Sequence, residues 1–253
     1  MHAIILAAGR GSRLNQLDAG QRPKCLLEFG GRSLLDRMLD ALQRNGVENC
    51  ALVIGHEGAR IIDHVSELPS RLGTAFHHNP RFEEGSVLSL GTASEFLKAG
   101  EPVLVLDADV LFHPKILDRL VGSAHENCFL LDRDFVPGAE PVKIAIQNDE
   151  MVEFGKQLPK SLKYDGLGES VGFFRFGPAC AARIAQRCAD FERAGRSQAP
   201  HEDVLREDLL EWPHDYGFED VTGLPWVEID FPEDVSRARD EILPVIQADI
   251  PGF

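Results

Sequence analysis

The chain has no apolar run long enough to cross a membrane and no recognisable secretory leader. The apolar stretch at residues 3–8 is far shorter than the roughly 18 residues that a membrane helix needs. It continues into Gly-Arg-Gly-Ser-Arg, and no basic segment followed by a cleavage site precedes it. We therefore expect a cytoplasmic protein without a membrane span.

Cysteines are few, and paired-cysteine motifs are absent. The chain has five, an odd number, and none forms a CxxC pair: Cys25, Cys50, Cys128, Cys180 and Cys188. This distribution argues against a disulfide framework and against a zinc knuckle. Reduced thiols without a catalytic role are the simplest interpretation.

Positive charge is scarce. Lysine and arginine total 26 against 41 aspartates and glutamates, which gives a formal net charge of −15. Such a surface repels nucleic acids and anionic membranes. We therefore expect no nucleic-acid partner, and any anion-binding site must be a local exception to the overall charge.

Internal repeats, low-complexity tracts and flexible linkers are also absent, so we interpret residues 1–253 as a single domain. In the first half, short β-branched runs alternate with segments of helical period. This pattern predicts an α/β, Rossmann-like, doubly wound fold with a mainly parallel mixed sheet. The expected strands are residues 2–8, 50–54, 75–78 and 103–106, and the expected helices are residues 33–44, 57–68, 86–97 and one opened by Pro114.

The pattern changes from about Cys128. Turn signals at Pro137-Gly138 and Asn148-Asp149 separate short strands and predict a small antiparallel extension of the sheet. The expected elements are strands at 128–131, 142–146, 151–154 and 171–176, helices at 179–193 and 202–210, a strand at 226–229 that returns to the sheet, and a last helix at 233–242.

A glycine-rich, basic loop follows the first strand. Between Arg10 and Lys24 the chain carries four cations, including Arg13 and Arg22, against a single acid, Asp18. In an acidic chain this local reversal favours a polyphosphate site. The loop matches neither GxxxxGK[ST] nor GxGxxG, and a purely structural strand-to-helix corner is the alternative.

Two acidic motifs follow predicted strands. Asp107-Ala-Asp109 lies at the carboxyl end of a buried strand, where open α/β sheets bind ligands, and Glu228-Ile-Asp230 repeats the arrangement. If the strand continues to Asp109, the period of two places Asp107 and Asp109 on one side. Paired carboxylates at such a place favour Mg²⁺, the alternative being a helix cap before Pro114.

These motifs carry a family resemblance over nearly the whole chain. The segment Leu6-Ala-Ala-Gly-Arg-Gly-Ser-Arg-Leu14, followed by Arg22-Pro-Lys24 and the two acidic motifs, resembles the nucleotidyltransferases that make NDP-sugars and CDP-alcohols, which have a GT-A-like fold. The order of Asn79-Pro80, residues 85–90 and the acidic motifs is most similar to the phosphocholine and phosphonate cytidylyltransferase branch.

The resemblance implies a role for each matching residue. The backbone of Leu6, Ala7, Ala8, Gly9, Arg10 and Gly11 would hold the base and phosphates of a nucleoside triphosphate. Arg13 would neutralise the leaving pyrophosphate, and Lys24 would bridge the α-phosphate and the attacking phosphate. Asp109 and Asp230 would bind Mg²⁺ directly, Glu228 would support the metal, and Asp107 would support the nucleotide. The chemistry needs such fixed charges because the protein does little covalent work.

Residues 79–90 are expected to pack beside the base. Gly85, Ser86 and Ser89 are candidates for selecting a pyrimidine, although Ser86 is equally interpretable as a helix cap. The choline-specific relatives carry asparagines and aromatics here, which residues 85–91 lack. That departure weakens an assignment to a quaternary ammonium acceptor.

The acceptor is expected over the antiparallel half. Lys143 and Lys156 are the candidate cations for its phosphate or phosphonate, and Lys156 looks like the sugar-phosphate lysine of the wider superfamily. Glu169, Glu202 and Asp203 are candidates for an ammonium or hydroxyls, with solvated side chains as the alternative. Residues 1–125 would thus bind the nucleotide and residues 126–253 the acceptor.

The resemblance therefore leads us to expect a Mg²⁺-dependent enzyme that transfers CMP from CTP to a small phosphorylated or phosphonylated alcohol, similar to phosphocholine or aminoethylphosphonate, and releases pyrophosphate. A homodimer is left open. The alternatives are a sugar-1-phosphate uridylyl- or thymidylyltransferase, a GT-A glycosyltransferase that uses Asp107-Ala-Asp109 as its DxD motif, and a nucleotide-binding regulator without turnover.

Overall fold

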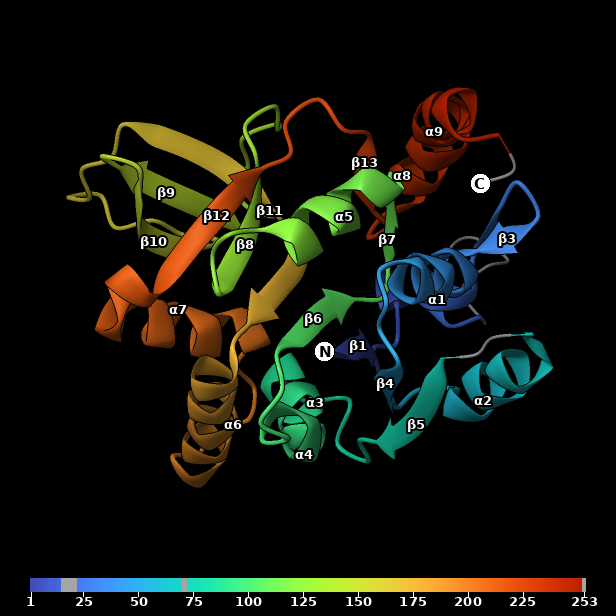
Figure 1. Ribbon diagram of the computed structural model, residues 1–253, viewed down its shortest axis with the longest axis horizontal. Coiled ribbons are helices and arrows are strands. Elements are labelled where there is room, and N and C mark those ends of the chain that lie inside the picture. The colour runs from blue at the N-terminus through green and yellow to red at the C-terminus, as the bar shows by residue number, and fades with distance from the viewer. Residues whose placement is uncertain (15–21, 70–71, 252–253) are drawn as a thin grey trace.

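The sheet is built around its first strand. In the computed structural model, which describes residues 1–14, 22–69 and 72–251, β1 (His2–Ala7) lies between β4 (Asn49–Ile54) and β6 (Val103–Asp107) and runs parallel to both (Figure 1). β5 (Gly73–His78) continues the parallel part beyond β4. These are the four strands that the first half of the sequence predicts, each within two residues of its expected start.

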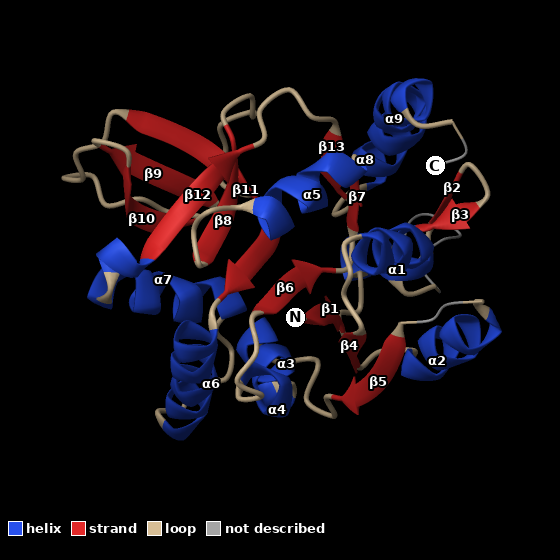
Figure 2. Ribbon diagram, viewed as in Figure 1, coloured by secondary structure: helices blue, strands red, loops and turns tan. Residues whose placement is uncertain are grey.

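The side chains of β1 alternate between two cores. Ala3, Ile5 and Ala7 belong to a cluster on one face of the sheet, whereas Ile4 and Ala8 belong to a cluster on the other. This is the period of two of an extended strand that is covered on both faces. Figure 2 shows helices on both sides of these strands.

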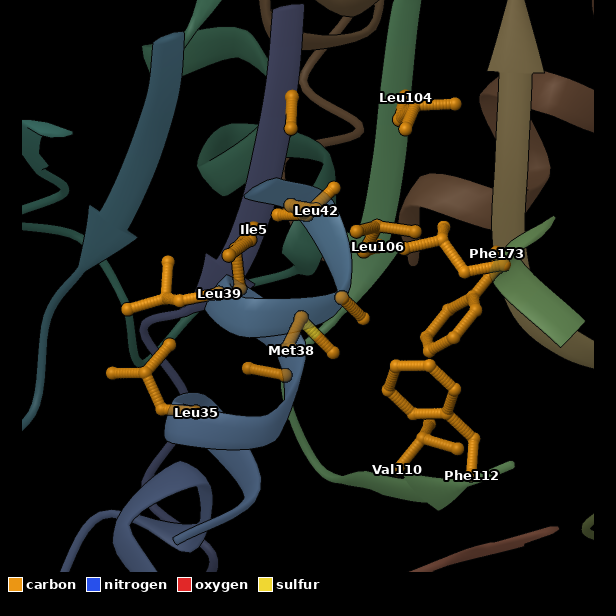
Figure 3. Packing of buried hydrophobic residues seen from close by; sticks show 14 of the residues in the cluster. Ile5, Leu35, Met38, Leu39, Leu42, Leu104, Leu106, Val110, Phe112 and Phe173 are labelled. Atoms are coloured by element: carbon orange, nitrogen blue, oxygen red, sulfur yellow. The ribbon is translucent and has the colours of Figure 1, made fainter. Parts of the chain in front are cut away.

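The first face is covered by α1 (Leu34–Arg44), α2 (Gly58–Glu67) and α5 (Pro114–Gly122). Figure 3 shows Met38 of α1 and Phe112 in the same cluster of buried side chains as the central strands.

The second face is covered by α3 (Ser86–Thr92), α4 (Ser94–Leu97), α6 (Pro178–Arg193) and α7 (His201–Glu211). The predicted single helix at residues 86–97 is wrong. It divides at Ala93, whose φ of −92° and ψ of 22° are not helical.

The antiparallel extension is joined to the parallel part by one long strand, β11 (Gly166–Phe176). Its carboxyl half pairs with β6, and strands of the extension pair with both of its halves. The extension consists of β8 (Asn127–Asp132), β9 (Lys143–Gln147), β10 (Glu150–Gly155) and β12 (Tyr216–Asp220). The expected α/β class with a small antiparallel extension is confirmed, and β12 is an addition to it.

Two short strands form a separate ladder beside the main sheet, and two predictions about this region are wrong. β13 (Trp226–Glu228) does not return to the main sheet but pairs antiparallel with β7 (Val110–Phe112) in a separate ladder. β6 ends at Asp107, so Asp109 lies in the turn between β6 and β7 and not on the strand. The chain leaves the plane of the sheet at this turn, which is why β7 needs a different partner.

A third buried cluster holds the carboxyl-terminal helices against the ladder. α8 (Pro232–Arg237) continues through a π-helical turn into α9 (Leu243–Asp249), so the helix expected at 233–242 is longer than predicted. A small hairpin of β2 (Glu28–Phe29) and β3 (Arg32–Ser33) packs here through Phe29. The ladder is thereby fixed to the loop that follows β1 through Leu14 of the same cluster.

Neither a membrane span nor a disulfide occurs in the part of the chain that the structure describes. No helix there is both long and apolar enough to cross a bilayer. All five cysteines are buried and free. Burial raises the pKa of Cys25 to about 12, so this thiol beside the site stays protonated.

Candidate nucleotide-binding and metal-binding site

A cavity of about 330 Å³ lies at the carboxyl ends of β1 and β6, and we call it the main cavity. Parallel strands end at the same edge of a sheet, so the loop after β1 and the acids after β6 meet there. The main cavity is lined by these predicted residues: Leu6, Ala7, Ala8, Gly9, Gly11, Lys24, Ser86, Ser89, Asp107, Asp109, Lys156, Glu202 and Glu228. A second hollow of about 210 Å³, the side cavity, shares Glu228 with it and contains Asp230 and Glu169.

The glycine-rich loop packs tightly on Lys24. Gly11 has a φ of +59°, which favours glycine, and a Cβ there would lie 2.9 Å from Cγ of Lys24. At Gly9, in contrast, a Cβ would meet nothing within 4 Å. The loop is therefore closed on the Lys24 side and leaves open space at Gly9, where backbone N–H groups can approach an anion.

The ammonium of Lys24 lies between two carboxylates that are far apart in sequence. Its Nζ donates to Oδ2 of Asp109 at 2.9 Å and to Oδ1 of Asp230 at 2.5 Å. Burial acts to lower the pKa of Lys24, but the two negative charges outweigh burial and raise it above its ordinary value. Burial likewise acts to raise the pKa of Asp230, yet Lys24 and Arg13 lower it.

The β7–β13 ladder brings the two acidic motifs together. Glu228 pairs with Val110, and the N–H of Ile229 donates to the carbonyl of Asp109 at 2.9 Å. One carboxylate oxygen from each of Asp109, Glu228 and Asp230 consequently lies within 4.8 Å of the others. Three carboxylates so close are the oxygen ligands that Mg²⁺ prefers, and the position of the Lys24 ammonium shows that a cation fits among them.

Two of the acids lack a full countercharge. Loss of water, followed by the charges of Glu202 and Asp109, raises the pKa of Asp107 well above its ordinary value. Loss of water, followed by repulsion from Asp109 and Asp230, does the same to the pKa of Glu228. The site therefore attracts positive charge beyond what Lys24 supplies.

Arg13 and Lys156 are linked through an unpredicted acid, Glu140. Arg13 donates to Asp230 at 3.0 Å and to Glu140 at 3.3 Å, and Lys156 donates to the same Glu140 oxygen at 3.2 Å. The guanidinium also lies over the ring of Phe231, 5.0 Å from its centroid. These cations lie on the same side of the site as Asp230, where phosphate oxygens can replace the carboxylates.

The other two cations of the basic loop point elsewhere. Arg10 pairs with Glu83 at 2.8 Å, and Arg22 pairs with Glu28 at 3.5 Å, both at exposed positions. Asp18, the single acid expected among the four cations, lies outside the described residues. The local excess of positive charge is therefore concentrated at Arg13 and Lys24.

The serines of α3 serve contacts that the sequence did not indicate. The interpretation of Ser86 as the cap of its own helix is wrong, because Gly85 is the N-cap residue and Ser86 Oγ accepts from the N–H of His201 at 2.8 Å. Ser89 Oγ accepts from Asn79 Nδ2 at 3.0 Å and is buried. Both side chains fix the wall of the main cavity.

Gly85 allows the two segments of this wall to touch. A Cβ at Gly85 would lie 2.0 Å from the carbonyl oxygen of Ala199.

We expect Gly85→Ala to lower the free energy of unfolding by about 2 kcal/mol and to displace the start of α7. Urea unfolding followed by circular dichroism measures this, with Gly122→Ala as the control because a Cβ there meets nothing within 4 Å. Equal stability of the two variants would contradict the packing argument.

The candidate acceptor residues divide between the cavities. Glu202 and Lys156 line the main cavity, whereas Glu169 lines the side cavity, where burial and then the charge of Asp132 raise its pKa to about 7. Lys143 lines neither, and its Nζ donates to the carbonyls of residues 138, 141 and 156. Its ammonium thus joins the loop before β9 to the end of β10.

His201 is one of the lining residues that sequence reasoning missed. It opens α7 directly after Pro200, and its side chain is only 3% exposed. A proline that precedes a helical segment is typical of a helix start, so the helix predicted to begin at Glu202 could have been extended back by one residue. Nothing local indicated that this histidine would face the acids after β6.

Comparison with known proteins points to one family. The family model of the MobA-like NTP transferase domain matches residues 3–155. A bifunctional IPC transferase and DIPP synthase of Rubrobacter xylanophilus is 30% identical over 95% of this chain and 52% of its own length. A CMP-5'-(3-aminopropyl)phosphonate synthase of Streptomyces rubellomurinus is 27% identical over 94% of this chain and 38% of its own. The chain thus spans about half or less of these two curated relatives.

The fold also matches a solved structure. The inositol-1-phosphate CTP transferase of T. maritima superposes with a TM-score of 0.75 over 99% of this chain and 96% of that one, at 19% sequence identity. The match continues beyond residue 155, where the family model ends, and so includes β11, β12 and β13.

Proposed function

Because the chain belongs to the family of MobA-like NTP transferase domains, we propose that it transfers CMP from CTP to a small phosphorylated or phosphonylated alcohol and releases pyrophosphate. The observation that carries the proposal is the position of Lys24, fixed between Asp109 and Asp230 beside the glycine-rich loop. A cation at this point can join two phosphates whose charges would otherwise repel each other.

We propose that the nucleotide lies along the loop after β1. Support comes from the open space at Gly9, from the small side chains of Ala7 and Ala8, and from the wall formed by Ser86 and Ser89. On this proposal residues 1–125 supply the nucleotide side of the site. The second half supplies Lys156, Glu202 and Glu228, together with Asp230 from the neighbouring side cavity.

Asp109, Glu228 and Asp230 are the residues that we propose to hold Mg²⁺. Their oxygens are mutually close, and carboxylates are the ligands of choice for this ion. When bound, the ion supplies charge neutralisation at the α-phosphate. Lys24 would then pass from the carboxylates to the phosphates, since both positions lie within reach of its flexible side chain.

The reaction is a direct displacement. An oxygen of the acceptor phosphate or phosphonate forms a bond to the α-phosphorus, the bond from this phosphorus to the bridging oxygen breaks, and pyrophosphate leaves with the electron pair. The attacking group is already an anion, so no side chain has to remove a proton. Lys24 aligns attacker and target, and Arg13 neutralises the leaving pyrophosphate.

The acceptor phosphate is proposed to bind Lys156. Its ammonium lines the main cavity, and its ion pair within the described part of the chain is an exposed one with Glu140. Exposed ion pairs contribute little to stability, so an incoming phosphate can replace this carboxylate easily. Lys143 is proposed to shape the loop instead, because its ammonium is already surrounded by carbonyls.

The donor base and acceptor class are tested by one panel. Purified protein with Mg²⁺ is given each of the four NTPs with phosphocholine, 2-aminoethylphosphonate, inositol phosphate or hexose 1-phosphates, and pyrophosphate is measured. We expect release with CTP and a phosphorylated alcohol, and none without acceptor. Preference for UTP or TTP with a hexose 1-phosphate would favour a sugar nucleotidyltransferase. Hydrolysis of sugar nucleotides without any NTP would favour a glycosyltransferase.

A further inference from the structure

One carboxylate oxygen at the edge of the site is shared by two cations. Oε2 of Glu140 accepts from Nη1 of Arg13 at 3.3 Å and from Nζ of Lys156 at 3.2 Å. The proposed function assigns Arg13 to the leaving pyrophosphate and Lys156 to the acceptor phosphate. Glu140 therefore puts an anionic oxygen at a point where the reaction would put the oxygen of a phosphate group.

The Glu140 carboxylate borders the space that a substrate would use. Glu140 lines the side cavity together with Asp230, and Lys156 lines the main cavity. The side chains of Arg13, Glu140 and Lys156 are 45%, 53% and 46% exposed. Ion pairs at such exposure are weak, because water screens them and two long side chains have to be ordered. A phosphate group can therefore displace this carboxylate from the two cations.

Glu140 belongs to a loop that is loosely attached to the sheet. The loop comprises residues 133–142 between β8 and β9, and we call it the strap. Within the described part of the chain, the backbone of residues 135–141 forms no hydrogen bond with other backbone groups. Val136 in the strap is 82% exposed. Segments with few backbone hydrogen bonds and exposed side chains open at a low cost in free energy, so the strap can move without unfolding the sheet.

The ammonium of Lys143 holds the strap where Glu140 reaches the cations. It donates to the carbonyls of Gly138 and Pro141, on either side of Glu140 in sequence, at 2.8 and 3.1 Å. It also donates to the carbonyl of Lys156 at 2.8 Å. The same group thus connects the backbone around Glu140 to the backbone of a cation that Glu140 contacts. The fold itself therefore positions this carboxylate.

We propose that Glu140 is an internal competitor for the phosphate groups of the substrates and of pyrophosphate. Its carboxylate and a phosphate oxygen cannot occupy the point between Arg13 and Lys156 together, so the strap moves away when phosphate binds and returns when phosphate leaves. The inference rests on the proposed function and adds to it a residue that weakens phosphate binding and promotes the release of pyrophosphate. Glu140 is a positioning residue, because it acts through the two cations.

The opposite role for Glu140 would be to hold the two cations ready while the phosphates bind. In that role the carboxylate would stay in place beside the bound phosphates. Two anionic groups in contact with the same cations repel each other at short distance. The position of Glu140 on the wall of a cavity and the weak attachment of the strap favour displacement instead.

The test measures the binding of inorganic pyrophosphate to the full chain in Mg²⁺ by calorimetry. Glu140→Gln keeps the shape of the side chain and removes its charge. We expect this variant to bind pyrophosphate at least about 3-fold more tightly than wild type, because two exposed ion pairs no longer have to be broken.

Asp134→Asn is the matched control. It removes the same charge from an exposed position of the same strap, and among the described residues Asp134 forms no ion pair with Arg13 or Lys156. The control is expected to bind pyrophosphate as wild type does, because salt screens the charge of an exposed side chain that does not contact the cations. Thermal unfolding of both variants checks the fold.

Steady-state kinetics gives a readout that a merely structural role would not move. The assay uses CTP, Mg²⁺ and whichever of phosphocholine, 2-aminoethylphosphonate, inositol phosphate and hexose 1-phosphates releases pyrophosphate fastest. Glu140→Gln is expected to lower both the KM of this acceptor and the inhibition constant of pyrophosphate about 3-fold, whereas kcat should not rise, because the product leaves more slowly.

The remaining outcomes also decide the matter. Unchanged or weaker binding of pyrophosphate by Glu140→Gln would overturn the inference, as would an equal gain in Asp134→Asn, which would indicate a general effect of charge. The proposed function would survive either result if wild type releases pyrophosphate from CTP. If wild type neither binds pyrophosphate nor releases it from any NTP, the proposed function itself fails, and the role of Glu140 fails with it.

Discussion

Replacing Asp109 by alanine is expected to lower kcat at least about 1,000-fold, which corresponds to about 4 kcal/mol of lost transition-state stabilisation. Asp109 holds Lys24 at 2.9 Å and belongs to the three carboxylates that lie within 4.8 Å of one another. Its removal therefore disturbs both Lys24 and the proposed metal ion. Pyrophosphate release under saturating CTP and acceptor, with Mg²⁺ varied, measures the loss.

The fold of this variant is expected to survive. Asp109 lies in a turn, and the contact that anchors this turn is its backbone carbonyl, which accepts from Ile229 and does not depend on the side chain. Asp63→Ala, on the exposed surface of α2, is the matched control and should keep the wild-type rate. A wild-type rate for Asp109→Ala in Mg²⁺ would show that this carboxylate holds no catalytic metal.

The parts of the site that the sequence predicted are those fixed by local geometry. A buried strand followed by small residues places Gly9 and Gly11 at the edge of the sheet, and a second parallel strand brings Asp107 to the same edge. The rule that parallel strands end together is independent of the rest of the chain. For this reason the meeting of the basic loop with the first acidic motif could be expected from order alone.

The parts that the sequence could not predict depend on contacts between distant segments. A strand at residues 226–229 was expected, but its partner was not, because β7 has three residues and shows no recognisable period. The pairing of these two strands brings Asp230 to Lys24. The bond from Ser86 to His201 crosses 115 residues and has no local signal.

Charge alone was a poor guide to which lysine faces the site. Lys143 begins β9 and Lys156 directly follows β10, and both were expected to bind the acceptor phosphate. The structure separates them, because three carbonyls surround the ammonium of Lys143, whereas Lys156 reaches the main cavity. These carbonyls come from residues 138, 141 and 156, and they are brought close to the ammonium only when β9, β10 and their loops are assembled.

Lys24→Ala is expected to reduce kcat about 1,000-fold and to lower the free energy of unfolding by only about 1 to 2 kcal/mol. The rate falls because the two phosphates lose the cation between them. Stability falls less because the carboxylates left behind border an open cavity and water can reach them. Lys98→Ala, at an exposed position, is the matched control for both measurements.

The pH dependence of this stability loss has a definite sign. The pKa of Lys24 is raised in the folded protein, so its ion pairs contribute fully below its ordinary value of 10.5 and are lost as the pH rises through the raised value. The pKa of Asp230 is lowered, so its contribution is present above its ordinary value of 3.8 and is lost as the pH falls through the lowered one. The difference between wild type and Lys24→Ala in urea unfolding should therefore be largest between these two ordinary values.

The same variant separates the two cations of the site. The ammonium of Lys24 contacts Asp109 and Asp230, which are the carboxylates proposed to hold the metal. A divalent ion must therefore compete with Lys24 for these carboxylates. Lys24→Ala should bind Mn²⁺ more tightly than wild type in the absence of nucleotide. Calorimetry or electron paramagnetic resonance measures this affinity. Asp109→Ala should weaken Mn²⁺ binding instead. Equal affinity for Mn²⁺ in wild type and Lys24→Ala would mean that the ion and the lysine bind different carboxylates. In that case a bound ion would not displace Lys24 from Asp109 and Asp230.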